Sequence, residues 1–160
     1  MEAKKVIAAS LIVVAVAGTA IFIAAGSRQG DPLEQNLYFV IYGQDWCPHC
    51  QAEMRFLNST FGSDRVEFRD LDNAEYQAEF LRAITELNKL GIPAGPYFPL
   101  TGIHVNGRLV AVVQGEISSP DYLRSVLENT EKGRILVVLG GQGYSIPPNQ
   151  VLEDVFQPNR

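Results

Sequence analysis

Both cysteines of the 160-residue chain lie in one stretch, Asp45-Trp46-Cys47-Pro48-His49-Cys50. The stretch follows a run of aromatic and β-branched residues and begins a helical pattern, so it marks a junction between a strand and a helix. A Cys-x-x-Cys pair in such a place is a dithiol whose reactivity the start of the helix can tune. We therefore expect the function of the chain to reside here.

The residues before the dithiol predict a buried strand. The chain runs without a polar residue through Leu37-Tyr38-Phe39-Val40-Ile41-Tyr42. The length of this run and its branched and aromatic side chains fit a strand that is covered on both faces. Gly43-Gln44-Asp45 then turns the chain, which places the dithiol at the end of a central strand.

The residues after the dithiol predict a helix with one buried face. Apolar residues recur at helical spacing, at Cys50, Met54, Leu57 and Phe61. Residues at this spacing share a face, and an apolar face points into the core. Cys50 is therefore expected to be turned inward and shielded from solvent.

Cys47 is expected at the N-cap of this helix, with Pro48 at the first helical position, where its fixed φ and missing N–H suit the helix. The free N–H groups and the dipole at this end favour a thiolate over a thiol. We therefore expect Cys47 to be the exposed nucleophile. The ring of His49 would lie beside the Cys47 thiolate and, by stabilising its charge, set the direction of electron flow.

Three other interpretations of the cysteine pair stay open. A zinc site needs about four ligands, and the other histidine, His104, lies in a different predicted strand. A structural disulfide across this short spacing would constrain little of the unfolded chain. Two buried spectator thiols would conflict with the exposed position expected for Cys47. Thiol–disulfide exchange is favoured, with neither a metal nor a cofactor expected.

The N-terminus predicts a membrane anchor over residues 1–26. Lys4 and Lys5 precede an uncharged apolar stretch from Val6 to Ala25. About 20 residues of helix reach roughly 30 Å, enough to span a bilayer. The lysines place the N-terminus in the cytoplasm and the remaining chain outside, joined by a polar linker over residues 27–35. A cleaved signal peptide is the alternative, with small residues at Ala15-Val16-Ala17 or Ala24-Ala25-Gly26.

About 130 residues follow the anchor, enough for one domain with its own core. The net charge of −5 and the absence of a basic cluster argue against a nucleic-acid partner. Val66 to Arg69 alternates as a short strand, which with the preceding strand and helix makes a βαβ unit with parallel strands. A second helix follows, with an apolar stripe formed by Tyr76, Phe80, Ile84 and Leu87.

The next segment, residues 91–99, is too rich in proline and glycine for regular structure. Leu100–Val105 and Leu109–Val113 then read as two strands joined by a hairpin turn at Asn106-Gly107. Ser119-Pro120-Asp121 begins a final helix.

This order of elements around a Trp-Cys-x-x-Cys helix resembles the thioredoxin superfamily over residues 36–131. The resemblance implies an α/β fold of three layers with a mixed central sheet. It also implies that Pro99 is a cis-proline beside the dithiol, although a trans-proline in a loop is the alternative. Phe98 and Trp46 are then expected to contact the substrate.

The dipeptide Pro48-His49 between the cysteines is the one found in the DsbA family of periplasmic disulfide oxidases. The residues from Tyr42 to Trp46 are more similar to the thioredoxin-like domains that accompany vitamin K epoxide reductase homologues. One departure concerns Ile41, which stands where thioredoxins place a buried acid. Proton transfer at Cys50 would then use water or another group, such as Asp45 or Glu116.

Residues 132–160 fall outside the resemblance. Arg134–Leu139 reads as an extra strand, with a turn at Gly140-Gly141-Gln142-Gly143. This extension is expected to cover an edge of the sheet. A surface for a dimer or another partner is the alternative.

The expected function is an extracytoplasmic thiol–disulfide oxidoreductase that forms or isomerises disulfides in exported proteins through Cys47 and Cys50. Because the chain has no third cysteine, its electrons must pass to a separate oxidant. The anchor suggests a membrane-embedded, quinone-coupled partner, such as a vitamin K epoxide reductase homologue. One alternative is a membrane-anchored reductase that runs the same dithiol in reverse. Another is a peptide-binding module without redox activity.

Overall fold

The computed structural model describes residues 30–159. The expected anchor, residues 1–26, lies outside the described residues. Between residues 30 and 159, no helix is both long and apolar enough to cross a membrane.

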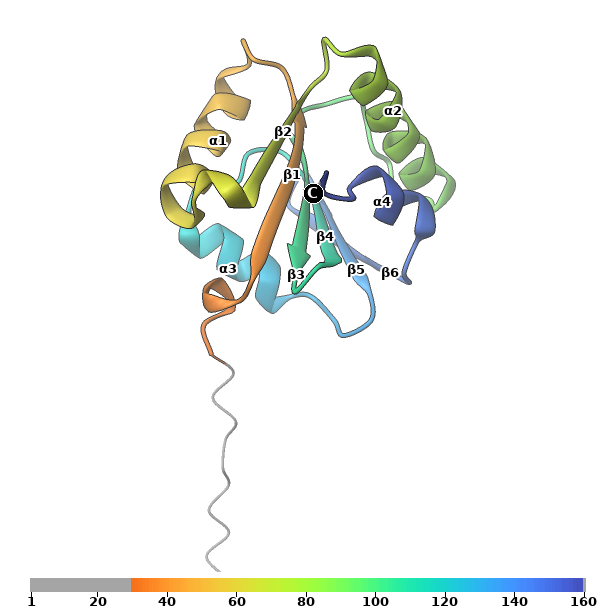
Figure 1. Ribbon diagram of the computed structural model, residues 1–160. Helices are drawn as coiled ribbons and strands as arrows, with labels where there is room; N and C mark the ends of the chain where they lie inside the picture. Colours follow the sequence, from red (N-terminus) through yellow and green to blue (C-terminus); the bar gives the residue numbers. More distant parts are fainter. Residues whose placement is uncertain (1–29, 160) are drawn as a thin grey trace, which may run out of the picture.

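This part of the chain forms six strands and four α-helices, with two short 3-10 helices (Figure 1). In chain order they are η1 (Pro32–Glu34), β1 (Leu37–Gly43), α1 (Pro48–Phe61), η2 (Ser63–Arg65), β2 (Val66–Asp70), α2 (Ala74–Lys89), β3 (Leu100–Val105), β4 (Arg108–Gln114), α3 (Pro120–Glu128), β5 (Ile135–Leu139), β6 (Gln142–Ile146) and α4 (Gln150–Val155).

The strands form one mixed sheet in the order β2-β1-β3-β4-β5-β6. β1 pairs with β2 in parallel, which confirms the βαβ unit predicted from the sequence, and β4 pairs with β5 in parallel. The other neighbours are antiparallel. β1 is therefore a central strand, and its carboxyl end points the same way as those of β2, β4 and β5.

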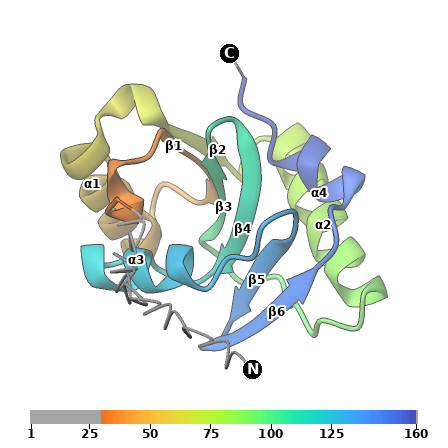
Figure 2. The same ribbon diagram turned by 90° about the horizontal axis from the view of Figure 1, so that it is seen from below.

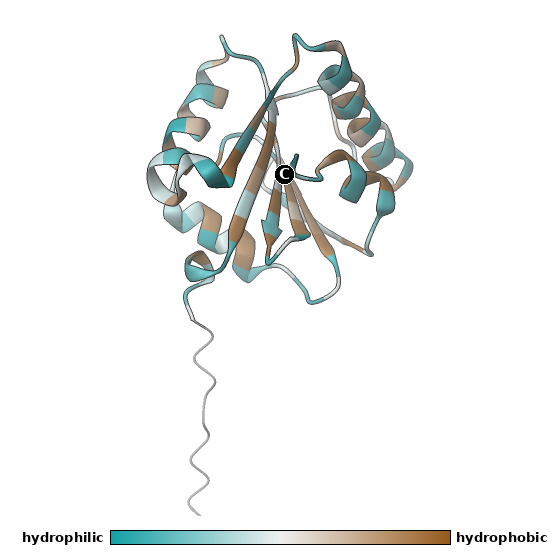
Figure 3. Cartoon of the chain, in the orientation of Figure 1, coloured by the Kyte–Doolittle hydropathy of each residue, from teal (hydrophilic) through white to brown (hydrophobic). Residues whose placement is uncertain are grey.

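Helices cover both faces of the sheet, which gives three layers (Figures 1 and 2). Leu57 of α1 and Leu123 of α3 join Phe39 and Ile41 of β1 in the core on one face. The α2 and α4 helices pack on the other face, over a second core. Figure 3 shows the strands and the inner sides of the helices as apolar and the outer sides as polar. The alternation along β1 decides which side chain enters which core.

The predicted hairpin between β3 and β4 is confirmed, with Val105 paired to Arg108. Asn106 and Gly107 adopt φ of 52° and 80°, the left-handed values that a two-residue hairpin turn requires. The hairpin brings β3 back beside β1, so that the start of β3 lies at the carboxyl end of β1.

The C-terminal extension contains more structure than the sequence predicted. The strand expected over Arg134 to Leu139 corresponds to β5, which lies beside β4. The expected turn over residues 140–143 is shorter, because Gly140 and Gly141 alone reverse the chain with φ of 55° and 80°. β6 begins at Gln142 and forms the outer edge of the sheet, and α4 returns over the α2 face. The extension thus shares its core with the rest of the domain.

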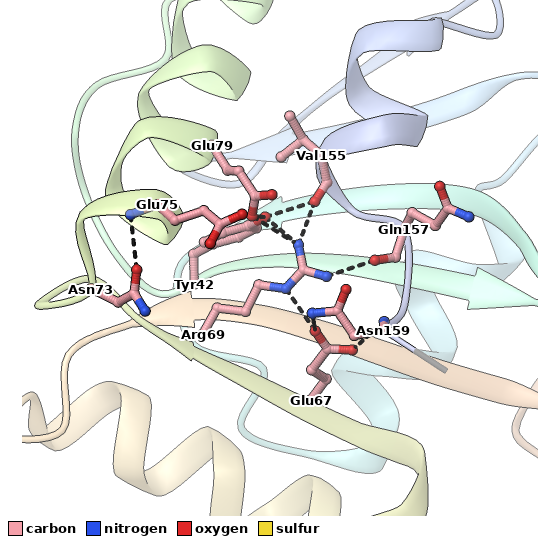
Figure 4. Close-up of polar contacts among 9 residues, drawn as sticks. All are labelled: Tyr42, Glu67, Arg69, Asn73, Glu75, Glu79, Val155, Gln157 and Asn159. Atoms are coloured by element: carbon pink, nitrogen blue, oxygen red, sulfur yellow. Dashed lines mark hydrogen bonds and ion pairs between the residues drawn. The ribbon is translucent and has the colours of Figure 1, made fainter.

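A buried arginine joins the C-terminal residues to β1 and β2 (Figure 4). Arg69 is 2% exposed and donates to the backbone carbonyls of Val155 at 2.7 Å and Gln157 at 2.6 Å. It also forms ion pairs with Glu67 at 2.7 Å and Glu79 at 3.1 Å, which compensate its buried charge. These bonds explain why a short terminal helix keeps a fixed place against the sheet.

Part of the segment expected to be a linker is folded. Residues 32–34 form η1, because Asp31 caps it at 3.0 Å from the Leu33 N–H and Pro32 suits its first position. Asp31 also pairs with Arg124 of α3 at 3.1 Å, and Leu33 packs against the core on that side. The expectation of a free linker over residues 27–35 is therefore wrong from Asp31 onward.

Candidate active site around Cys47 and Cys50

The dithiol lies where β1 ends and α1 begins. A turn closes between the two elements, in which the Cys47 N–H donates to the Gln44 carbonyl at 3.0 Å. The side chain of Gln51 donates back to the Asp45 carbonyl at 2.5 Å. Cys47 is the N-cap of α1 and Pro48 its first residue, as the sequence predicted.

Cys47 is less exposed than predicted. Only 5% of the residue is accessible, so Cys47 is buried and the expectation of an exposed thiol is wrong. The reason is its capping geometry, because the side chain folds back over the first turn of the helix and Sγ accepts from the Cys50 N–H at 3.3 Å. The sulfur thereby receives an N–H group of the helix terminus, a contact that stabilises negative charge.

Cys50 is fully buried, as predicted. Its sulfur lies against Gly43, where an added Cβ would come within 2.7 Å of Sγ. Desolvation, with a smaller effect of the hydrogen bond to Cys47, raises the pKa of Cys50 to about 12. The Cys50 thiol therefore holds its proton at neutral pH, and any reaction through its thiolate needs a proton acceptor.

A buried acid that the sequence analysis missed lies one turn further along α1. Glu53 is 0% exposed and stands on the same helix face as Cys50 and Leu57. Its carboxylate accepts from the Thr101 hydroxyl at 2.5 Å and from the Ile117 N–H at 3.1 Å. The signal was in the sequence, since Glu53 stands three residues after Cys50 and four before Leu57.

Burial changes the acidity of this carboxyl group. Desolvation raises the pKa of Glu53 to about 7, against the opposing effect of its two hydrogen bonds. A group with this pKa can both take and give a proton near neutral pH. Of the two acids that the sequence suggested for proton transfer at Cys50, Asp45 is exposed and Glu116 contacts His49.

His49 points to a carboxylate. Its Nδ1 lies 2.7 Å from Glu116 Oε2, and the His49 side chain is 73% exposed. Glu116 follows β4, so this contact links the first turn of α1 to the end of another strand. The carboxylate orients the ring at the mouth of the site.

The residues expected to contact substrate gather beside the dithiol end of α1. The Phe98–Pro99 peptide bond is cis, and Pro99 immediately precedes β3. The Phe98 and Trp46 rings meet edge to face with centroids 6.1 Å apart, and Trp46 is 66% exposed. Tyr97, which the sequence analysis did not single out, is 71% exposed in the same loop.

Between residues 30 and 159, no group of three or more His, Cys, Asp or Glu side chains lies close enough together to hold a metal ion. His104 is buried in β3, away from the dithiol turn. Comparison of the chain with family models, curated proteins and solved structures found no match.

Proposed function

We propose that the chain is a thiol–disulfide oxidoreductase with a thioredoxin-like domain, and that Cys47 and Cys50 carry its reaction. The observation that supports this most directly is the asymmetry of the two sulfurs. Cys47 Sγ accepts an N–H from the first helical turn, whereas Cys50 is buried and its thiol pKa is raised to about 12. This asymmetry suits Cys47 to form the bond with the substrate and Cys50 to resolve the resulting mixed disulfide.

The oxidised protein would take two electrons from its substrate in two exchanges. A substrate thiolate attacks Cys47 Sγ, the Cys47–Cys50 bond breaks, and the Cys50 sulfur leaves and is protonated. The second thiolate of the substrate then attacks the substrate sulfur that is bonded to Cys47, and Cys47 leaves as a thiolate. The substrate gains one disulfide, and the protein is left with two reduced cysteines.

Glu53 is the group that we assign to the proton at Cys50. A bare thiolate at this buried position is unfavourable, and Glu53 lies on the same buried helix face with a pKa of about 7. It can supply the proton when Cys50 leaves and accept it when Cys50 attacks. The buried acid would thus come from α1, whereas thioredoxins place it on the strand, at the position that Ile41 of β1 holds here.

The dithiol must be reoxidised by a separate oxidant, because the chain contains only two cysteines. We propose that residues 1–26 anchor the domain outside the cytoplasm beside a membrane-embedded, quinone-coupled oxidoreductase. The exported substrates would acquire or rearrange disulfides there. Operation as a reductase uses the same residues in the opposite direction, and the redox potential of the dithiol distinguishes the two.

Trapping of mixed disulfides tests the proposal. The reduced full-length chain in a neutral detergent is mixed with the disulfide-linked dimer of a peptide that carries one cysteine, so that attack by Cys47 releases one peptide thiolate. Adducts are identified by mass. Cys50→Ser should accumulate a long-lived disulfide between Cys47 and the peptide, whereas Cys47→Ser should form none. Equal trapping by both variants, or by neither, would exclude the proposed roles. Equilibration with glutathione then gives the potential, and a strongly reducing value would favour the reductase.

A further inference from the structure

The surface around the dithiol carries charge of one sign. β1, β2, β4 and β5 end at this edge of the sheet, and β3 begins there. Residues 44–49, 70–75, 95–99, 114–119 and 140–141 lie in the connections at this edge and in the adjoining ends of the strands and helices, and we call them the dithiol face. Its charged residues are all acidic, namely Asp45, Asp70, Asp72, Glu75 and Glu116, and His49 is the one side chain of this face that can carry a positive charge. Lysine and arginine are absent from the dithiol face.

Two of these carboxylates lie on opposite sides of the dithiol. The Gln44 side chain donates to Asp72 at 3.4 Å, and the Leu71 N–H donates to the Gly43 carbonyl at 2.8 Å. These bonds hold the acidic turn after β2 against the turn that leads to Cys47. On the other side, Glu116 reaches His49 at 2.7 Å. A substrate that approaches Cys47 therefore passes between acidic groups.

Exposed aromatic side chains occur on the same face and give an independent reason to expect a peptide there. Among the described residues, the large hydrophobic side chains that are exposed are Trp46, Leu81, Leu90 and Tyr97. Both aromatic members of this set belong to the dithiol face. Aromatic residues with an apolar ring and a polar group are typical of contact surfaces in protein complexes.

The loop that carries Tyr97 is held in place. The Gln114 side chain donates to the Gly95 carbonyl at 2.7 Å and to the Tyr97 carbonyl at 2.8 Å. The Tyr97 ring also lies close over Gly95, where any side chain would collide with it. Because the backbone of this loop is already held, little backbone entropy is lost when a partner covers the exposed Tyr97 ring.

We infer from these observations that the dithiol face selects cysteine-containing substrates that are basic next to the reacting cysteine and carry an apolar residue beside it. The inference rests on the proposed thiol–disulfide exchange and names its substrate class. Carboxylates around Cys47 raise the local concentration of cationic peptides and repel acidic ones, an effect on the association rate. The Trp46 and Tyr97 rings then receive the apolar side chain.

Exchange rates with a matched peptide series test the inference. Three dithiol peptides share one sequence, with a leucine beside the first cysteine, and differ only in two flanking residues: lysine, glutamine or glutamate. Each is mixed with the oxidised full-length chain in neutral detergent. The rate for each peptide is divided by its rate with bis(2-hydroxyethyl) disulfide, a neutral reagent, which removes the intrinsic reactivity of the peptide thiols.

The normalised rate should be on the order of tenfold higher for the lysine peptide than for the glutamate peptide at low ionic strength. The difference should shrink toward equality in 1 M salt, where screening reaches only about 3 Å. Asp45→Asn combined with Asp72→Asn should reduce the preference. Asp64→Asn combined with Glu128→Gln changes the net charge equally but away from the dithiol face, and should leave the preference intact.

Replacement of Tyr97 by serine tests the aromatic part. It should slow exchange with the leucine peptides several-fold but not with versions in which glycine replaces leucine. If exchange occurs but the normalised rates of the three peptides are equal, the inference is overturned and the proposed function stands. The same holds if the two double variants change the preference equally. An absence of exchange with every peptide would overturn the proposed function and the inference with it.

Discussion

Cys50 and Glu53 lie one turn apart on the buried face of α1, and neither residue is exposed to solvent. Burial raises the pKa of both groups, that of Cys50 to about 12 and that of Glu53 to about 7, and a charge on Glu53 adds a small further rise at Cys50. The two groups therefore disfavour being ionised together. In the proposed exchange reaction, transfer of a proton between them would keep the pair at one negative charge or none.

Glu53→Gln should slow the step in which Cys50 attacks a mixed disulfide. The glutamine keeps the size and the hydrogen-bonding capacity of the side chain but cannot accept the Cys50 proton. Loss of a general base should lower this rate on the order of 100-fold at neutral pH. The mixed disulfide of Cys47 with 2-mercaptoethanol is prepared, and its resolution is followed by mass over a range of pH.

Asp45→Asn is the matched control for Glu53→Gln, since it removes an exposed acid near Cys47. It should leave the resolution rate of the neutral mixed disulfide within about twofold, because exposed charges interact weakly. The Glu53→Gln defect should diminish at high pH, where hydroxide removes the Cys50 proton. An equal rate for Glu53→Gln and the wild type at neutral pH would remove Glu53 from the mechanism.

The raised pKa of Glu53 also predicts how stability depends on pH. The group binds its proton more tightly in the folded protein, at a pKa of about 7, than in the unfolded chain, at about 4.5. Its contribution to the free energy of unfolding is therefore fully present below pH 4.5 and is lost as the pH rises through 7. The shift corresponds to about 3 kcal/mol between these limits.

Glu53→Gln should lack this loss, since a glutamine does not titrate. The difference in free energy of unfolding between variant and wild type, measured with urea on the reduced proteins, should shift in favour of the variant from pH 4.5 to pH 7.5. Measurements stay below pH 8 because the Cys50 thiol, with its pKa raised to about 12, adds its own dependence at higher pH. A difference that stays constant with pH would show that Glu53 titrates normally.

The sequence predicted best those elements whose residues repeat an apolar pattern. β1 is apolar throughout, α2 carries a clear stripe, and Asn106-Gly107 permits one turn geometry. β6 was missed because it is an edge strand, and Ile146 is its one buried residue. An exposed strand shows no apolar alternation, so its formation depends on β5 beside it.

The candidate active site shows the same difference between local and long-range signals. The positions of Cys47 and Pro48 follow from local capping rules, and the sequence predicted them. Glu53 was missed because charged residues of an amphipathic helix usually lie on its outer face. Its burial depends on Thr101 and Ile117, which are distant in sequence and supply its hydrogen bonds. The low exposure of Cys47 was missed because it results from a side-chain orientation within the first helical turn.

Gly43→Ala should disturb the dithiol through packing alone. The new Cβ would lie 2.7 Å from Cys50 Sγ and 3.0 Å from a ring carbon of Phe68, and both distances require a shift of the neighbours. Overpacking of this kind costs about 1–3 kcal/mol of stability. Urea unfolding of the reduced protein measures it. Gly143→Ala is the control, because its Cβ would meet no atom closer than 3.4 Å, and an unchanged stability for both variants would contradict the close packing of Cys50.

His49→Ala should make the dithiol more reducing. The ring or its N–H can stabilise charge on the sulfur of Cys47, two residues before it. Loss of the ring also leaves the Glu116 carboxylate, which lies 2.7 Å from His49 Nδ1 in the wild type, without this partner on the dithiol face. Both effects disfavour the reduced form, since only the reduced form can carry a thiolate. One to two charge-assisted contacts are worth about 1.5 to 3 kcal/mol, or roughly 30 to 65 mV for a two-electron couple. Because the His49 side chain is 73% exposed, we expect a shift near the lower value.

Equilibration with glutathione buffers, with the redox state read by alkylation and mass, measures the His49→Ala potential. The double variant His49→Ala/Glu116→Gln separates the two contributions, because it removes the unpaired carboxylate as well. Its potential should lie between those of the wild type and of His49→Ala, since the repulsion is relieved while the histidine contact stays lost. If His49→Ala kept the wild-type potential, His49 would not tune the dithiol, and the preference for an oxidase over a reductase would then depend on the compartment alone.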